Sequence, residues 1–204
     1  MSEPLRVALV GCGGMGRRHL RAYIALERSP WVRLAAVCDT DEGRREAARA
    51  EFERATGRPV AAHPTLAEAA AATGLDGADI AVPTRYHHTA AIEAFGLGLH
   101  VQVEKPIALT VRAARAMIEA ARAAGLTLAV SENFRRVPAN RAIRALLADG
   151  AIGRPYWTSS ELVLPAEKLH PQGGGEWYRD RAMSGSLVAL EMGVHEADLL
   201  AFMF

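Results

Sequence analysis

The sequence predicts an α/β fold: a doubly wound parallel sheet, followed by a second, incomplete α+β domain. Over residues 1–131, short apolar runs rich in β-branched residues alternate with alanine-rich amphipathic stretches. This is the pattern of a parallel sheet covered by helices on both faces. After residue 130 the alternation stops. We therefore expect two domains, over residues 1–131 and 132–204.

Six strands are expected in the first domain, each from a short apolar run, at residues 6–10, 33–38, 59–62, 79–82, 100–103 and 127–130. The clearest helix between them covers residues 110–124, because charged residues repeat on one face and apolar residues on another. Thr110 is a favoured N-cap residue and Gly125 a favoured stop. We expect the helix to begin and end at these two residues.

The second domain is expected to contain one strand between helices. A helix is predicted over residues 140–148, closed by Gly150, and the Thr, Trp, Tyr and Val content of residues 156–164 predicts a strand. A loop rich in Pro and Gly follows at 165–175, and a strongly apolar helix runs from residue 186 to the end. Because the single strand has no visible partner, we expect the chain to be a C-terminally truncated form of a longer protein.

Charge balance and cysteine content exclude several classes of protein. The 204 residues carry 24 Lys and Arg against 23 Asp and Glu, so no strong field attracts nucleic acid or an anionic membrane. Cys12 and Cys38 form neither a disulfide framework nor a zinc pattern. The opening residues lack a cleavage pattern, and no uncharged apolar stretch approaches the roughly 18 residues of a membrane span. We expect a cytoplasmic protein without nucleic-acid or membrane partners.

A GxGxxG motif follows the first predicted strand and opens the next helix. In this context the first glycine permits a tight turn, the second lets a pyrophosphate approach the backbone, and the third permits close helix packing. The alternative is a glycine-rich turn that only packs tightly. We interpret the motif as the phosphate loop of a Rossmann-type NAD(P)-binding domain. Its candidate cofactor-binding residues are Gly11, Gly13, Gly14, Met15 and Gly16.

Asp39 ends the second predicted strand, where a carboxylate can accept hydrogen bonds from the ribose hydroxyls of a dinucleotide. Its charge favours NAD over NADP, because it would repel a 2′-phosphate. Arg44 and Arg45 lie close enough in sequence to weaken this preference. We therefore expect NAD as the cofactor, with NADP as the alternative.

Two further segments follow predicted strands at the edge where open α/β sheets bind ligands. Glu104-Lys105-Pro106 follows the fifth strand, and a lysine there can stabilise a developing alkoxide. The alternative is a salt bridge followed by a turn. Pro83 follows the fourth strand, and His87 either faces the cofactor or caps the next helix. We name Pro83, His87, Glu104 and Lys105 as further cofactor-binding candidates.

A polar stripe runs along the otherwise apolar last helix. Glu191, His195 and Asp198 are spaced i, i+4, i+7 and share one face. A helix that is apolar around most of its circumference is normally buried, so the stripe is expected to line a cleft. A solvent-exposed face is the first alternative. A metal site is the second, but no further ligands are evident, and we expect no metal.

These segments, in this order, resemble the Gfo/Idh/MocA family of NAD(P)-dependent oxidoreductases, which includes glucose-fructose oxidoreductase and inositol dehydrogenase. The resemblance runs from residue 5 to the chain end and rests on the segments GCGGMG, CDTD, VPTRYHH, VEKP, ENFRRVP and SLVALEMGVHEADLL. It implies hydride transfer between nicotinamide and a secondary alcohol of a sugar, polyol or related compound.

The resemblance also implies the catalytic residues. Lys105 would stabilise the developing oxyanion, His195 would act as the general base, and Glu191 would hold a neighbouring substrate hydroxyl. The sequence departs from the family pattern at two of its residues. Glu191 stands where the family usually has Asp, and Val82 stands where Thr or Ser often precedes the proline.

Two other functions stay open on the sequence. One is NAD-dependent glycoside hydrolysis on the same fold. The other is a non-catalytic, cofactor-sensing role, against which the presence of both Lys105 and His195 argues. Family members continue beyond the last helix into an open, mostly antiparallel sheet. We therefore expect the intact protein to be an active homo-oligomer, and the 204-residue chain to bind NAD without turnover.

Overall fold

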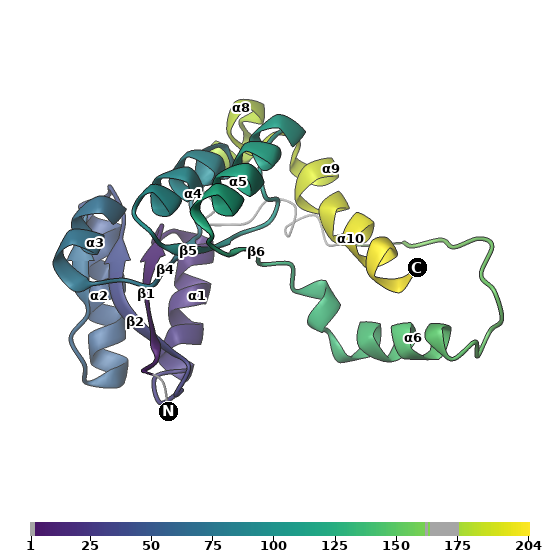
Figure 1. The fold of residues 1–204 in the computed structure, drawn as a ribbon, viewed down its shortest axis with the longest axis horizontal. Coiled ribbons are helices and arrows are strands. Elements are labelled where there is room, and N and C mark those ends of the chain that lie inside the picture. The colour runs from purple at the N-terminus through teal and green to yellow at the C-terminus, as the bar shows by residue number, and fades with distance from the viewer. Residues whose placement is uncertain (1–2, 162, 164–175) are drawn as a thin grey trace. The chain divides into compact units, whose positions relative to one another are not determined.

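The computed structural model describes residues 3–161, 163 and 176–204 (Figure 1). The predicted loop at 165–175 lies outside the described residues. The chain divides into two compact units, Met1–Val130 and Ser131–Phe204. The first unit holds the sheet, and the regular elements in the described part of the second unit are helices.

The first unit is built on a six-stranded parallel sheet, which confirms the predicted fold class. Its strands are β1 (Leu5–Val10), β2 (Val32–Cys38), β3 (Ala61–His63), β4 (Gly77–Ile80), β5 (His100–Val103) and β6 (Leu128–Val130). Their order is β3-β2-β1-β4-β5-β6, and every neighbouring pair is parallel. The direction of winding reverses between β1 and β4. In such sheets ligands bind at this point, outside the carboxyl ends of the strands.

Helices cover both faces of this sheet (Figure 1). On one face α1 (Gly14–Ala25) and α2 (Glu42–Thr56) contribute Leu20 and Phe52 to a core with Leu9 and Val37. The opposite face is covered by α3 (Leu66–Thr73), α4 (His87–Gly96) and α5 (Val111–Ala124). A short helix, η1 (Thr84–Tyr86), leads into α4. Burying both faces holds the carboxyl ends of the strands at one rigid edge.

The ends of α5 are capped as the sequence predicts. The Thr110 side chain accepts a hydrogen bond from the backbone N–H of Ala113, and Gly125 takes the left-handed conformation with φ 66°. Asp41 caps α2 in the same way, accepting from the N–H of Arg44. Local capping chemistry therefore sets these helix boundaries.

The second unit contains the short helices η2 (Phe134–Arg136), η3 (Glu176–Arg179), α8 (Arg181–Ser184) and α9 (Leu187–Glu191), and the longer α6 (Pro138–Ala148) and α10 (Gly193–Met203). Helix α6 begins two residues before the predicted start, because proline suits the first turn of a helix. None of the helices formed by described residues in either unit is long and apolar enough to cross a membrane.

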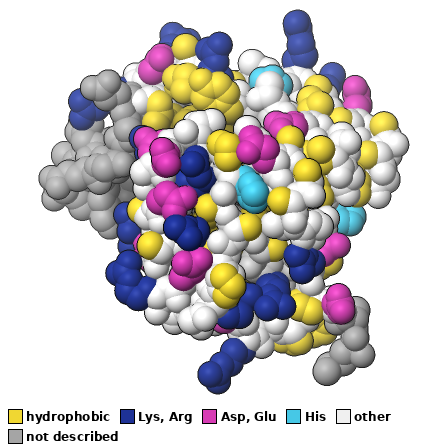
Figure 2. All heavy atoms as spheres, turned by 90° about the vertical axis from the view of Figure 1, so that its left-hand side faces the viewer, with side chains coloured by type: hydrophobic (Ala, Val, Ile, Leu, Met, Phe, Trp, Pro, Cys, Tyr) yellow, Lys and Arg dark blue, Asp and Glu magenta, His cyan; other side chains and the backbone are white. Residues whose placement is uncertain are grey.

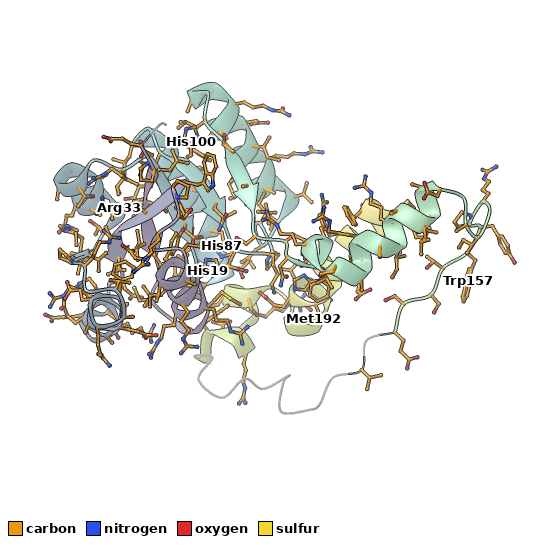
Figure 3. All side chains as sticks on the ribbon, turned by 90° about the horizontal axis from the view of Figure 1, so that it is seen from below. His19, Arg33, His87, His100, Trp157 and Met192 are labelled. Carbon is orange, nitrogen blue, oxygen red and sulfur yellow. The ribbon has the colours of Figure 1, made fainter. Side chains whose placement is uncertain are left out.

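Two predictions for the second unit are wrong. Residues 156–161 and 163 form no strand: Tyr156 and Trp157 are 99% and 77% exposed, and Figure 3 shows Trp157 on an extended segment. A strand forms only where another strand pairs with its backbone. The predicted helix from residue 186 to the end is also broken, at Met192 between α9 and α10. Gly193 beside the break weakens helix propensity there.

Acidic and basic side chains are interspersed on the face that Figure 2 displays. On the helices of the first unit they form ion pairs, such as Arg17 with Glu51 at 2.7 Å and Arg49 with Glu46 at 2.6 Å. Opposite charges at such distances largely cancel each other's field. Each of these ion pairs therefore adds little net field at the surface.

Candidate cofactor and catalytic site

The glycine-rich loop joins β1 to α1 and requires glycine at two positions. Gly11 has φ 95°, and a Cβ there would lie 2.7 Å from the carbonyl oxygen of Ala81. A Cβ at Gly16 would lie 1.8 Å from the carbonyl oxygen of Gly11. The first glycine thus permits the turn, and the last permits α1 to pack against it.

The middle glycines leave open space at the N-terminus of α1. A Cβ at Gly13 or Gly14 would meet nothing within 4 Å. No side chain caps α1 and no acidic residue lies in its first turn, which contains the exposed Met15. Backbone N–H groups and the positive end of the helix dipole are therefore available to an anion. This loop fits the pyrophosphate of a dinucleotide.

Asp39, directly after β2, anchors this loop. Its Oδ2 accepts a hydrogen bond from the backbone N–H of Cys12 at 2.8 Å, and its Oδ1 accepts from that of Asp41 at 2.9 Å. Each carboxylate oxygen can accept a second hydrogen bond, so Asp39 can still accept hydrogen bonds from ribose hydroxyls. The two nearby arginines are engaged locally. Arg45 donates to the Asp39 carbonyl at 2.8 Å, and Arg44 lies 3.8 Å from Asp41.

His87 joins the loops that follow β4 and β5. It is 1% exposed, with Nδ1 2.9 Å from the carbonyl oxygen of Pro106 and Nε2 2.9 Å from that of Val82. Its side chain does not cap α4. The geometry gives the ring a bridging position beside Pro83, which precedes η1. The ring thus links the loop after β4 to the loop after β5 at the carboxyl edge of the sheet.

Glu104 and Lys105 directly follow β5 at the carboxyl edge. Glu104 is 9% exposed and continues the sheet, since its N–H donates to the carbonyl of Ile80 at 2.9 Å. Its Oε2 accepts from the backbone N–H of Lys105 at 3.0 Å, and the Lys105–Pro106 peptide bond is cis. Lys105 is half-buried. The Glu104 side chain thus holds the backbone on which Lys105 stands.

A buried cluster that the sequence analysis missed lies next to Glu104. His19 of α1 places Nε2 2.9 Å from Glu104 Oε1 and Nδ1 2.8 Å from Oδ2 of Asp79, on β4. Tyr23, one turn further along α1, donates its hydroxyl to Asp79 at 3.0 Å. The sequence does carry a signal for this cluster. Asp79 is a charged residue within the apolar run of β4, and His19 and Tyr23 are polar residues spaced i, i+4 on α1.

In the second unit His195 of α10 is 5% exposed and held by two residues before α6. Its Nδ1 lies 2.7 and 2.8 Å from the two carboxylate oxygens of Glu132, and the Phe134 ring stacks on the imidazole with centroids 4.0 Å apart. Glu132 also accepts from the N–H of Phe134 at 2.9 Å. A carboxylate on Nδ1 fixes the tautomer and leaves Nε2 as the acceptor. The sequence analysis did not identify Glu132.

Residues of the predicted polar stripe do not share one partner: His195 contacts Glu132, whereas Asp198 contacts Arg135. Glu191, at the end of α9, is 4% exposed. Asp198 pairs with the guanidinium of Arg135, which joins η2 to α10. Among the described residues, no three His, Cys, Asp or Glu side chains are placed to share a metal ion.

The candidate residues thus form two groups, one in each unit. The first unit holds the glycine loop, Asp39, the His87 bridge, Glu104 and Lys105, and the second holds Glu132, Glu191 and His195. The first group suits a dinucleotide. The second supplies a buried imidazole with a carboxylate partner, the pairing used in general acid and base catalysis.

Family models match both units of the chain. Residues 5–132 match the family described as "Oxidoreductase family, NAD-binding Rossmann fold", Gfo/Idh/MocA, and residues 140–204 match the family's C-terminal domain. The chain is 33% identical over 200 residues to D-apiose dehydrogenase of Paraburkholderia graminis, covering 97% of this chain and 49% of that protein. It is 35% identical to inositol 2-dehydrogenase of Streptomyces avermitilis, covering 76% and 43%.

Among solved structures, the WlbA dehydrogenase of Bordetella pertussis, crystallised with NADH and UDP-GlcNAcA, superposes with a TM-score of 0.80. The two chains are 27% identical, and the match covers 98% of this chain and 59% of that one. The chain spans about half the length of the curated relatives it matches.

Proposed function

The chain belongs to the Gfo/Idh/MocA family of oxidoreductases, and from this premise we propose that it carries the cofactor site and catalytic residues of an NAD-dependent sugar or polyol dehydrogenase. The observation that carries the proposal is the buried His195 with Nδ1 on Glu132. A carboxylate that accepts from Nδ1–H leaves Nε2 as the proton acceptor, which suits the imidazole to act as a general base. The proposed domains are 1–131 for the cofactor and 132–204 for part of the substrate domain.

In the proposed complex the loop at Gly13 and Gly14 holds the pyrophosphate, and Asp39 accepts the ribose hydroxyls. Gly13 and Gly14 leave the required space, and the N-terminus of α1 supplies the donors. Asp39 is already oriented by two backbone N–H groups. When bound, NAD supplies the nicotinamide ring that accepts the hydride.

The protein's own part in the reaction is proton transfer and charge stabilisation. His195 accepts the hydroxyl proton of the substrate at Nε2, because Nδ1–H donates to Glu132. Within the described residues, no protein group hydrogen-bonds to Nε2. Glu132 then stabilises the imidazolium that forms. Lys105 places a cation against the developing alkoxide, and Glu191 holds a neighbouring hydroxyl.

The proposed substrate is a secondary alcohol in a sugar or polyol. Relatives that share this family and align over most of this chain carry names such as D-apiose dehydrogenase and D-glucoside 3-dehydrogenase. We also propose that the whole protein works in the cytoplasm as a homo-oligomer. Apolar side chains at the surface of the second unit, such as Leu146 and Ile152, which are 57% and 73% exposed, support association.

The test is NADH release from a panel of sugars and polyols by the protein expressed from its full reading frame. We expect net NADH formation, and His195→Ala should lower kcat by about 10²-fold or more with NAD affinity within twofold of wild type. His100→Ala is the matched control, because His100 lies at the start of β5, away from the candidate residues. Glycoside hydrolysis without net NADH release, or NAD binding without any turnover, would refute the dehydrogenase assignment.

A further inference from the structure

A buried ionic bridge links the phosphate-binding helix to the loop that carries Lys105. His19, labelled in Figure 3, stands on α1 between Asp79 and Glu104, at 2.8 and 2.9 Å from one oxygen of each. The side chains of His19, Asp79 and Glu104 are only 15%, 2% and 11% exposed. The bridge therefore joins three elements, α1, β4 and the end of β5, out of contact with most solvent.

Both ring nitrogens of His19 act as donors. A neutral imidazole has one N–H, whereas each nitrogen here faces a carboxylate oxygen. Burial disfavours the charged ring, but the hydrogen bonds and charges of Asp79 and Glu104 outweigh burial and raise the pKa of His19 to about 10. The residue is therefore an imidazolium at neutral pH, and its two bonds are charge-assisted.

The other groups around the bridge make this cation necessary. Asp79 also accepts from Tyr23 at 3.0 Å and from the side-chain amide of Gln102 at 3.3 Å, both of them neutral donors. Burial and the Asp79 charge raise the pKa of Tyr23 above its usual value, so its hydroxyl stays protonated. Of the three arginines of α1, Arg17 and Arg21 pair instead with Glu51 of α2, and no contact joins Arg18 to Asp79 or Glu104. His19 is thus the cation shared by two buried carboxylates.

The bridge continues to the candidate catalytic lysine. Glu104 accepts from His19 with Oε1 and from the backbone N–H of Lys105 with Oε2. One carboxylate therefore connects α1, whose N-terminus forms the phosphate loop, to the backbone of Lys105. A side chain held by bonds at both oxygens has little rotamer freedom.

We propose that His19 is a positioning residue: its bridge through Glu104 fixes the Lys105 backbone relative to the phosphate-binding helix α1. The proposal deepens the proposed function and rests on it, since Lys105 is there the cation beside the reacting alkoxide. Without the imidazolium, Asp79 on β4 and Glu104 directly after β5 repel each other, and Glu104 releases the Lys105 N–H.

The first test measures amide hydrogen exchange by NMR in the 204-residue chain with His19→Gln. We expect exchange at the Lys105 amide to accelerate about tenfold relative to core amides such as Leu9, the effect of losing one charge-assisted hydrogen bond. The matched control is His100→Gln, which removes an exposed histidine that accepts from the N–H of Thr127. Its Lys105 exchange should stay within twofold. Unchanged Lys105 exchange in His19→Gln overturns the proposal.

A second measurement does not depend on whether a His19 variant folds, because it uses the wild-type protein. In the wild-type chain, the ring nitrogens of His19 should both carry protons at pH 8, seen in ¹⁵N-edited NMR. A neutral His19 ring at that pH overturns the proposal. Glu104→Gln should lower the pH at which this ring titrates, because it removes one of the two carboxylates.

A third measurement separates positioning from the proposed function itself. Lys105 is also a cofactor-binding candidate, so we expect His19→Gln to weaken NADH binding about tenfold. The affinity for ADP-ribose, which lacks nicotinamide, should stay within twofold. An unchanged NADH affinity, or an equal loss for both ligands, overturns the positioning role. If the wild-type chain binds neither ligand, the proposed function fails, while Lys105 amide exchange still decides whether the bridge holds that backbone.

Discussion

Both carboxylate oxygens of Glu132 lie within 2.8 Å of Nδ1 of His195. The contact joins the segment before η2 to α10, and both side chains are less than 10% exposed. Because the carboxylate holds the proton on Nδ1, the lone pair of the imidazole is on Nε2. Glu132 therefore determines which nitrogen of His195 can accept a proton from a substrate.

Glu132→Ala should remove this orientation. We expect kcat for polyol oxidation by the protein from its full reading frame to fall by about 10²-fold, the scale of general base catalysis. Glu132→Gln, whose amide oxygen still accepts from Nδ1–H, should lose less. Glu161→Gln, at an exposed acid of the same unit, is the control. Full activity in Glu132→Ala would show that His195 does not depend on this carboxylate.

Added side chains at Gly13 and Gly16 should impair different properties: cofactor affinity at Gly13 and folding stability at Gly16. In Gly13→Val the side chain enters open space where the pyrophosphate is proposed to lie, so NAD affinity should fall at least about tenfold with an unchanged Tm. Gly16→Ala places a methyl group 1.8 Å from a backbone oxygen, so unfolding free energy should fall by roughly 1–3 kcal/mol. Calorimetric titration and thermal denaturation measure the two effects. Wild-type NAD affinity in Gly13→Val would contradict the phosphate loop.

Asp39 should determine the choice of cofactor. We expect the wild-type chain to bind NAD more tightly than NADP, because a 2′-phosphate would meet the Asp39 carboxylate. Asp39→Ala should narrow the difference between the NAD and NADP affinities. It should also loosen the glycine-rich loop, because it removes the hydrogen bond from the Cys12 N–H. Asp39→Asn keeps an acceptor and removes the charge, so it separates repulsion from loop anchoring. Tighter binding of NADP by the wild type would contradict the expectation.

The stability of the first unit should fall at alkaline pH through His19. The pKa of His19 in the folded chain is raised to about 10, above the value of about 6.5 in an unfolded chain. Its stabilisation is therefore complete below pH 6.5 and is lost as pH rises through about 10. At about 1.4 kcal/mol per pKa unit, the loss is on the order of 5 kcal/mol. Tm measured from pH 6.5 to 10 should fall more in wild type than in His19→Gln, and parallel curves would contradict the assignment.

The strands of the first unit could be predicted because their signals are local. A buried parallel strand is a short apolar run, and Thr110 and Gly125 mark the ends of α5 by chemistry that acts within four residues. Residues 156–164 carry strand-forming side chains, yet the described part of that segment forms no strand. Strand formation depends on a partner for the backbone, which propensity does not reveal.

Local sequence patterns suffice to predict the doubly wound sheet, the glycine loop with Asp39 at its edge, and the residue types of the candidate site. The side chains that hold those residues in place become evident only in the folded chain. His19 meets Asp79 and Glu104 across 60 and 85 residues, and Glu132 meets His195 across 63. Periodicity and capping act between near neighbours in the chain, whereas a buried charge is compensated by whichever partner the packing of strands and helices brings to it.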